Sequence, residues 1–403
     1  MSADLGNGSA QLAVARELFE REFGDAGHGA LLAVHAPARS EIAGNHTDHE
    51  GGHVIAGALN VAIDGVAAAN GTNRVRVASA GYPTFEISLD DLSEREDEHV
   101  TTAGLVRGMA ASLVATGREA AGFDLAMTSD IPSGGGLSSS AAVEAALGRV
   151  MEALWEGPEV SAIELAKMGQ FAENRYFGKP CGLMDQAAVC LGGLAFMDFE
   201  DPEEPRTAKL ELDFDACGYA LCLVDVGCDH APFTADYAAV PVEMQQVAEE
   251  FGCRRLCEVD EAEFDRRVPE LREKLGDRAI LRAVHYWREN ELVDARWDAL
   301  QSGDVERFLE LTRDSGASSA MFLQNVSTGG SFQPAMLALG LAERALDGRG
   351  ATRIHGGGFG GSIQCFVPLA LVDEFTARMN AWLGEGACVH YSIAERGAYA
   401  QWL

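Results

Sequence analysis

The chain has little positive charge, and nearly all of it is arginine. Of the 403 residues, 31 are Lys or Arg and 62 are Asp or Glu, so the formal net charge is −31. Only four residues are lysines (Lys167, Lys179, Lys209 and Lys274). Nucleic acids and anionic membranes bind proteins through a basic face, so the composition argues against both as partners. We interpret the excess acids as solubilising surface charge; the alternative is a salt-adapted source.

Long apolar runs and cysteine motifs are also missing. No apolar run approaches the roughly 20 residues that span a bilayer, and the first ten residues (MSADLGNGSA) lack the basic and apolar parts of a secretion signal. The nine cysteines contain no CxxC pair. With 47% hydrophobic residues the chain can still bury a core. We therefore expect a cytoplasmic protein with reduced thiols.

Two common catalytic motifs are absent from the sequence. The pattern GxxxxGK[ST] occurs nowhere, which disfavours a P-loop hydrolase, and GxSxG does not occur either, which disfavours a hydrolase with a nucleophile elbow. If the protein binds phosphate, some group other than a P-loop lysine must neutralise the phosphate charge.

The hydrophobic pattern predicts alternating strands and helices. Residues 11–23 and 141–154 have apolar positions at helical spacing, whereas residues 74–80 and 123–129 alternate as strands do. A polar, Gly-rich loop is predicted over residues 38–53. Residues 200–211, rich in Asp, Glu and Pro, predict the main domain boundary.

One Gly/Ser loop lies between a predicted strand and a predicted helix. Residues 133–140 (SGGGLSSS) combine glycines, which let a backbone approach a ligand closely, with serines at a helix N-terminus. Together with the helix dipole they form a layout that binds anions. The alternative is a flexible turn with a serine cap. The strongly helical sequence that follows at once favours phosphate binding.

A second polar segment, residues 39–52 (RSEIAGNHTDHEGG), gathers an arginine, histidines, acids and an asparagine. The spacing of His46, His49 and His53 leaves a metal site open, but the segment is not HExxH and is too rich in glycine for a helix. Short polar side chains also suit a ligand with many hydroxyls, because each hydroxyl needs a donor and an acceptor. The third alternative is a solvated surface loop.

Two further features could carry chemistry. Asp185 lies among apolar residues after a tight loop, which is typical either of a helix N-cap or of a functional carboxylate; Glu173 lies late in the preceding predicted helix. The segment 355–361 (HGGGFGG) has five glycines around one aromatic residue. It predicts either a strand connection or a rigid floor beneath a ligand.

Taken in order, these segments resemble the GHMP sugar and isoprenoid kinases, and within them the galactokinases. The stretches that carry the resemblance are Arg39 with Gly-Asn-His-Thr-Asp48 and Gly-Gly52, Pro132 to Ala141, Cys181-Gly-Leu-Met-Asp-Gln186, Gly356 to Gly361, and His230 with Asp236-Tyr237. Each motif alone is weak, but all of them in order, over most of the chain, are specific.

The resemblance implies a two-domain α/β (α+β) fold. Its N-terminal domain, residues 1–200, would contain a left-handed βαβ unit, an exception to the usual right-handed rule. Its C-terminal domain, residues 201–403, would be ferredoxin-like, with a return of the last strand to the first domain kept as an option. The active site would lie between the domains, and the protein would be a monomer or a weak homo-oligomer.

The resemblance also implies transfer of the γ-phosphoryl group of ATP to the anomeric hydroxyl of galactose, with Mg²⁺ as cofactor. Asp185 would accept the proton of the sugar hydroxyl, and Arg39 would stabilise charge on the transferred group. The sugar would contact Asn45, His46, Asp48, Gly182 and Tyr237. The nucleotide loop would comprise Ser133, Gly134, Gly135, Gly136, Leu137, Ser138, Ser139 and Ser140. Mg²⁺ would be held by Ser139 or Ser140 and by Glu173.

The sequence departs from the galactokinase pattern around the sugar-binding loop. Galactokinases usually carry Glu where this chain has Asn45 and Asn where it has Glu41, and a Tyr-Asn pair is here His49-Glu50. An amide donates and accepts whereas a carboxylate only accepts, so another hexose or an amino sugar remains an alternative substrate. A non-catalytic sugar sensor and a mevalonate-type kinase are further alternatives. The intact serines and Asp185 argue against the sensor, and the segments 46–48 and 181–186 argue against the mevalonate type.

Overall fold

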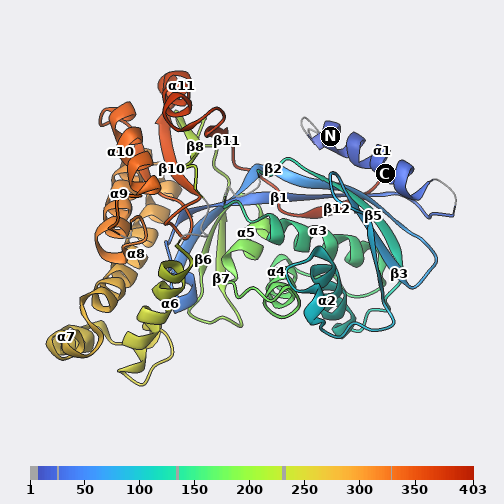
Figure 1. The fold of residues 1–403 in the computed structure, drawn as a ribbon, viewed down its shortest axis with the longest axis horizontal. Helices are drawn as coiled ribbons and strands as arrows, with labels where there is room; N and C mark the ends of the chain where they lie inside the picture. The colour runs from blue at the N-terminus through green and yellow to red at the C-terminus, as the bar shows by residue number, and fades with distance from the viewer. Residues whose placement is uncertain (1–7, 25–26, 133–135, 229–232, 328) are drawn as a thin grey trace.

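The computed structural model describes residues 8–24, 27–132, 136–228, 233–327 and 329–403. Two sheets, each with its own helices, form two lobes (Figure 1). The first sheet has the strand order β12-β1-β2-β5-β3-β4, and β6 joins it by pairing with β2 and carries β7. Its strands are β1 (Leu32–Ala43), β2 (His53–Ala69), β3 (Arg74–Ser79), β4 (Phe85–Ser88), β5 (Phe123–Ser129), β6 (Leu194–Asp198), β7 (Arg206–Leu210) and β12 (Tyr399–Trp402).

Helices cover both faces of the first sheet because its strands alternate between two apolar sides. On β2, Val66 and Ala68 pack against α1 (Gly8–Phe23), whereas Ala67 belongs to the main core on the opposite face. That opposite face carries the other helices of this lobe (Figure 1). They are α2 (Thr102–Ala115), α3 (Ser139–Leu154), α4 (Ala162–Phe171) and α5 (Met184–Leu191). A capping box formed by Ser161 and Glu164 starts α4.

The predicted polar loop over residues 38–53 is wrong in its first part. β1 continues to Ala43, and Arg39, Ser40 and Glu41 pair with Ala58, Gly57 and Ala56 of β2. Strand pairing with the long, apolar β2 overrides the polar composition, and two register shifts after Pro37 and Glu41 accommodate it. Arg39 and Glu41 are therefore placed by a sheet and not by a loop.

The parallel pair of the first sheet lies at β3 and β5. The other strand pairs in the described residues are antiparallel. The chain connects β3 to β5 through β4 and α2. The predicted left-handed βαβ unit would lie here, and its handedness stays a prediction.

The second sheet has the order β11-β8-β10-β9, with every neighbouring pair antiparallel. Its strands are β8 (Tyr219–Asp225), β9 (Ala351–Ile354), β10 (Ser362–Pro368) and β11 (Cys388–Tyr391). Helices follow β8 and precede β9, and α11 (Val372–Leu383) separates β10 from β11. This is the split βαβ order of a ferredoxin-like domain, as expected.

The two faces of β8 join the lobes. Cys222 and Val224 pack on a core shared with α10 (Pro334–Leu346) and α11 (Val372–Leu383), whereas Leu221 and Leu223 belong to the main core of the first lobe. The remaining helices of the second lobe are α6 (Thr234–Glu249), α7 (Glu261–Leu275), α8 (Asp277–Ser302) and α9 (Val305–Ser318). In Figure 1, α6 lies on the side that faces the first lobe, and α7 lies far from that lobe.

The first sheet draws on segments from beyond residue 200. β7 lies within the segment predicted as the boundary and pairs with β6, and β12 pairs with β1. In Figure 1 both ends of the described chain lie beside this sheet. The division of the chain into folding units at residue 200 stays a prediction. No helix in the described ranges is long and apolar enough to cross a membrane.

Candidate active site

Asp185 and Arg39 form an ion pair between the two elements of the first lobe that carry them. Arg39 Nε donates to Asp185 Oδ1 at 2.7 Å, and Ser138 Oγ donates to the other carboxylate oxygen. Arg39 also donates to the carbonyl of Gly136 at 2.6 Å. Asp185 is the second residue of α5, whose N-cap is Leu183, so Asp185 is not the cap. Both oxygens are oriented by donors, yet 29% of the side chain remains exposed.

The guanidinium of Arg39 is itself buried, with 7% of its side chain exposed. Burial lowers its pKa, but the adjacent carboxylate of Asp185 more than offsets that effect and raises the pKa of Arg39 above its usual value. Arg39 therefore remains a fixed positive charge beside the carboxylate.

The described part of the predicted nucleotide loop runs into the N-terminus of α3. Ser133, Gly134 and Gly135 lie outside the described residues. Leu137 is buried and its carbonyl accepts from the backbone N–H of Arg39 at 3.3 Å. Ser138 has a positive φ of 56° and Ser139 begins the helix. The structure thus places the loop beside Arg39, where helix N–H groups and hydroxyls favour an anion.

Ser140 and Glu173 come together across the same helix end. Ser140 Oγ donates to Glu173 Oε1 at 3.0 Å, and Lys179 Nζ lies 3.6 Å from that oxygen. Glu173 lies in a π-helical turn (Ala172–Phe177) that continues α4. Such turns are frequent at functional sites because they redirect side chains. The hydroxyl and the carboxylate are oxygen donors of the kind that Mg²⁺ prefers.

Sequence reasoning missed two residues of this cluster. Gln186 Nε2 donates to Glu173 Oε2 at 2.7 Å and to Glu144 Oε2 at 3.1 Å. Burial and the charge of Glu173 raise the pKa of Glu144 well above its usual value. Glu144 lies four residues after Ser140 on α3, and that i,i+4 spacing was the available signal.

The loop of residues 44–48, predicted to bind sugar, faces the Gly-rich turn at residues 356–361. His46 has a φ of 60°, and its Nε2 lies 2.9 Å from the carbonyl oxygen of Gly357. A carbonyl only accepts, so Nε2 carries the proton and Nδ1 is left as an acceptor. Burial and neighbouring His49 lower the pKa of His46 to about 3, so the ring is neutral.

Tyr237 of α6 closes this side of the site. Its ring centroid lies 5.5 Å from that of His46, and 41% of the residue is exposed. Burial and the charges of Asp185 and Asp48 raise its pKa to about 12, so the phenol stays protonated. A Cβ on Gly357 would lie 2.1 Å from the Tyr237 ring, which explains the glycine.

Asp48 and Gly182 meet where the loop approaches α5. A Cβ on Gly182 would lie 2.2 Å from Asp48 Oδ2, so only glycine allows this approach. His49 Nδ1 lies 3.2 Å from the other oxygen of Asp48, and interactions with His49 and His46 hold the pKa of Asp48 below its usual value despite burial.

Asn45 is completely buried below this surface. Its side chain contacts Glu41 and the Gly-rich turn. Contacts between neighbours thus bring six predicted residues together, and Asn45 is buried below them: Arg39, His46, Asp48, Gly182, Asp185 and Tyr237.

The alternative of a histidine metal site finds no support in the described residues. The rings of His46 and His49 lie 5.4 Å apart, but His53 Nδ1 instead contacts Asp294 at 2.7 Å. No group of three or more His, Cys, Asp or Glu side chains that could hold a metal ion occurs in the part of the chain that the structure describes.

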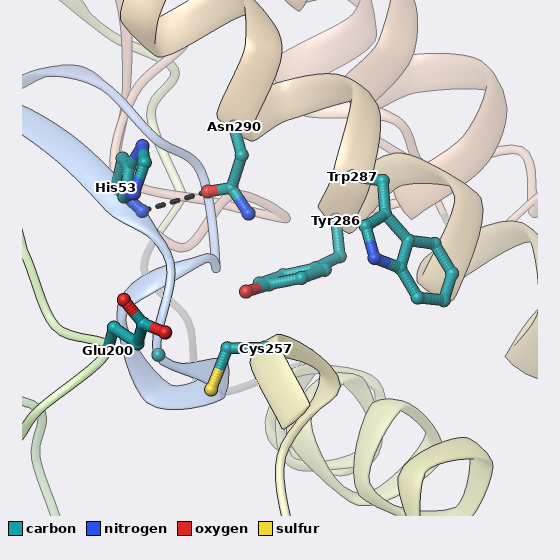
Figure 2. A pocket seen from close by; sticks show the side chains of 7 residues that line it. His53, Glu200, Cys257, Tyr286, Trp287 and Asn290 are labelled. Carbon is teal, nitrogen blue, oxygen red and sulfur yellow. Dashed lines mark hydrogen bonds between the residues drawn. The ribbon is translucent and has the colours of Figure 1, made fainter. Parts of the chain in front are cut away.

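His53 borders a separate cavity of about 210 Å³ behind the loop (Figure 2). Its backbone N–H donates to Asn290 Oδ1 at 2.8 Å. None of the predicted site residues lines it; its walls are Gly51, His53, Glu200, Cys257, Tyr286, Trp287 and Asn290.

Two family descriptions match the chain. The description of the GHMP kinases N terminal domain matches residues 104–193, which include the nucleotide loop and Asp185. The galactokinase galactose-binding signature matches residues 17–69, which include Arg39 and the loop of residues 44–48.

Curated proteins and solved structures agree with these matches. The galactokinase of Actinobacillus pleuropneumoniae serotype 3 (strain JL03) is 31% identical over 86% of this chain and 88% of its own length. That of Glaesserella parasuis serovar 5 (strain SH0165) is 31% identical over 88% and 89%. The crystal structure of Lactococcus lactis galactokinase complexed with galactose matches with a TM-score of 0.81 and 25% identity, covering 97% of this chain and 99% of that one.

Proposed function

This chain belongs to the galactokinase family of the GHMP kinases, and from that membership we propose that it transfers the γ-phosphoryl group of ATP to the anomeric hydroxyl of galactose. It is an ATP-dependent sugar kinase. The observation that supports the chemistry best is the pair of Arg39 and Asp185, with Ser138 on the second carboxylate oxygen.

The proposed step is general-base and electrostatic catalysis. Asp185 accepts the proton of the anomeric hydroxyl as the sugar oxygen bonds to the γ-phosphorus, and the bond from that phosphorus to the β-γ bridging oxygen breaks. ADP leaves with the electron pair of the broken bond. Arg39 offsets negative charge on the transferred group, and the remaining rate comes from holding the reactants in line.

The nucleotide would bind at the N-terminus of α3, where residues 133–140 supply backbone N–H groups and hydroxyls. Mg²⁺ would be held by Ser140 or Ser139 together with Glu173. The fit is supported by the 3.0 Å contact of Ser140 with Glu173. The ion would supply positive charge that offsets the charge of the phosphate groups. Mn²⁺ binding measured by electron paramagnetic resonance tests this set; we expect weaker binding in Ser140→Ala and no change in Ser112→Ala.

The sugar would lie against His46, Asp48, Gly182 and Tyr237. A neutral His46 presents an acceptor at Nδ1, a protonated Tyr237 presents a hydroxyl donor, and Asp48 presents a carboxylate acceptor. This mixture suits a ligand with several hydroxyls of fixed orientation. The close approach of Asp48 to Gly182 sets the spacing between the loop of residues 44–48 and the start of α5, which carries Asp185.

A coupled assay of ADP release on a panel of hexoses and amino sugars tests the proposal. We expect galactose to give the highest kcat/KM, with the sugar 1-phosphate identified by phosphorus NMR. Turnover of a different sugar with galactose inert would overturn the substrate but keep the kinase. A folded protein that turns over no sugar would overturn both.

A further inference from the structure

Asn45 uses its entire hydrogen-bonding capacity inside the protein. Its Nδ2 donates to Glu41 Oε1 at 3.1 Å and to the carbonyl of Gly356, and its Oδ1 accepts from Asn325 Nδ2 at 2.5 Å and Ser319 Oγ at 3.3 Å. A primary amide has two N–H donors and two acceptor lone pairs, so none is left over. The residue is 0% exposed. Asn45 therefore has no polar atom free for a sugar hydroxyl.

The orientation of this amide follows from its partners. The carbonyl of Gly356 can only accept, and so can an ionised Glu41, which requires the nitrogen of Asn45 on that side. On the other side, Asn325 presents its Nδ2, which also donates to the carbonyl of Gly357 at 3.2 Å. A carboxylate at position 45 would place two oxygens against two acceptors and would lose both donated bonds.

The charge around Asn45 is already balanced. Glu41 pairs with Arg353 at 2.9 Å, and Glu289 lies 3.6 Å from Arg296; all four side chains are 5% exposed or less. Two acids thus face two guanidiniums in a space that excludes water. A third carboxylate there would be buried without a partner, which costs several kcal/mol. A neutral amide at position 45 keeps the balance.

The partners of Asn45 join the loop of residues 44–48 to the second lobe. Glu41 lies on β1, but Ser319, Asn325 and Gly356 belong to the second lobe. The backbone of the loop is held by the same lobe: the carbonyl of Asn45 lies 3.0 Å from His285 Nε2, and Gly44 N donates to Glu289 Oε1 at 3.2 Å. The next residue, His46, contacts Gly357.

From these contacts we propose that Asn45 is a positioning residue: it locks residues 44–48 onto the Gly-rich turn, so that His46 and Asp48 meet the sugar at a fixed distance from Asp185. It acts on the sugar through these neighbours and not by contact of its own. This inference rests on the proposed function. The same arrangement explains why a carboxylate is tolerated at position 41: Glu41 accepts from Asn45 and pairs with Arg353.

The test compares Asn45→Asp with wild type on galactose and on the monodeoxygalactoses that wild type phosphorylates. Asp has the shape of Asn but cannot donate. We expect the KM for each sugar to rise by the same factor, about tenfold or more, with the KM for ATP changed less than twofold. If Asn45 instead contacted a sugar hydroxyl directly, the variant and wild type would have the same KM for the one monodeoxygalactose that lacks this hydroxyl. That result would overturn the inference.

Asn290→Asp is the matched control. It makes the same substitution behind the same loop. Asn290 accepts from His53 N and also hydrogen-bonds the Tyr286 hydroxyl; an Asp keeps the first acceptor and can accept from that hydroxyl. We expect its KM values to stay within twofold of wild type. An equal rise in both variants would mean that added negative charge, and not the loss of donors, is responsible, which also overturns the inference.

Ser319→Ala and Asn325→Ser keep the test decisive if Asn45→Asp does not fold. Each removes a donor to Asn45 Oδ1, and each should raise the KM for all the sugars uniformly, the second more than the first. Unchanged KM values in both would overturn the inference. Wild-type turnover of galactose is measured first: its absence is a failure of the proposed function, whereas a hydroxyl-specific effect in an active enzyme is a failure of this inference alone.

Discussion

Two arginine–carboxylate pairs lie at two depths of the same site. Arg39 and Asp185 are 2.7 Å apart in the pair whose carboxylate is partly exposed, and Arg353 and Glu41 are 2.9 Å apart in the buried pair. The side chain of Asp185 is 29% exposed, but that of Glu41 is 5% exposed. The same chemistry therefore has two uses. An exposed carboxylate can take a proton from a ligand, whereas a buried one can only fix the groups around it.

The largest effect should come from removing the exposed carboxylate. Asp185→Asn is expected to lower kcat by about 10²- to 10⁴-fold, because the general base is lost while the shape is kept. The unfolding midpoint should change little. A rapid coupled assay and a thermal melt measure both quantities. In Ser138→Ala the base remains and only one of its donors is lost, so kcat should fall by much less; equal losses in the two variants would contradict the assignment of the base.

Removing a carboxylate of the buried pairs should lower the stability of the fold more than it lowers kcat. Glu289→Ala removes the carboxylate partner of Arg296, which keeps its bond to the carbonyl of Ile42, and the acceptor of the Gly44 backbone N–H. We expect the free energy of unfolding to fall by about 3–5 kcal/mol. Urea unfolding measures this change. Glu291→Ala, on the exposed side of the same helix, is the control and should cost little. If kcat fell 100-fold while stability was kept, the separation of the two layers would be wrong.

A third prediction concerns the pH dependence set by Glu50, a separate buried carboxyl that accepts from the backbone N–H of Leu256. Burial raises the pKa of Glu50 from 4.5 to about 7, so between these values the folded state holds the proton more tightly than the unfolded state. The corresponding stability is present below pH 4.5 and is lost as the pH rises through 7. Glu50→Gln should thus be more stable than wild type at pH 8, by about 1–3 kcal/mol, and similar to it at pH 4.5.

Denaturant titrations at the two pH values measure that difference. Glu200→Gln is the control, because the side chain of Glu200 is 66% exposed and should show no such trend. An equal gain for Glu50→Gln at both pH values would show that the effect is not one of protonation.

The smallest effect on activity should come from disturbing the close approach of Gly182 to Asp48. Gly182→Ala places a Cβ 2.2 Å from Asp48 Oδ2, so the carboxylate must shift. We expect the KM for galactose to rise about tenfold, an effect of about 1.4 kcal/mol, with little change in the KM for ATP. Steady-state kinetics in both substrates measure this. Gly340→Ala in α10, where a Cβ meets nothing within 4 Å, is the control. A variant with lower stability but an unchanged KM for galactose would show that Gly182 serves the fold and not the binding of the sugar.

The charge of −31 does not oppose this chemistry. In the proposed site, Arg39, Lys179 and helix N–H groups would lie near the phosphates, and the proposed sugar is neutral. The acids of the site are paired: Asp185 with Arg39, and Glu173 with Lys179 and Ser140. The excess charge therefore bears on encounter with the nucleotide, which we expect to be faster at higher ionic strength.

Much of the site was available from the sequence. The serines at the start of α3, the segment around Asp185 and the Gly-rich turn are local patterns, because glycines at tight approaches and serines at helix starts have local causes. The same holds for the capping box of α4. Their order along the chain indicated the family, which the comparisons show.

The sequence could not indicate which polar residues lie at the surface of the site and which lie beneath it. Composition predicts Arg39 and Glu41 in a loop, yet pairing with β2 makes them part of a strand. Asn45 belongs to the same motif as His46, but partners from residues 319, 325 and 356 enclose it. Exposure depends on contacts between residues hundreds of positions apart. By itself the sequence determined the chemical groups and their order, and only the tertiary structure decided which of them a ligand can reach.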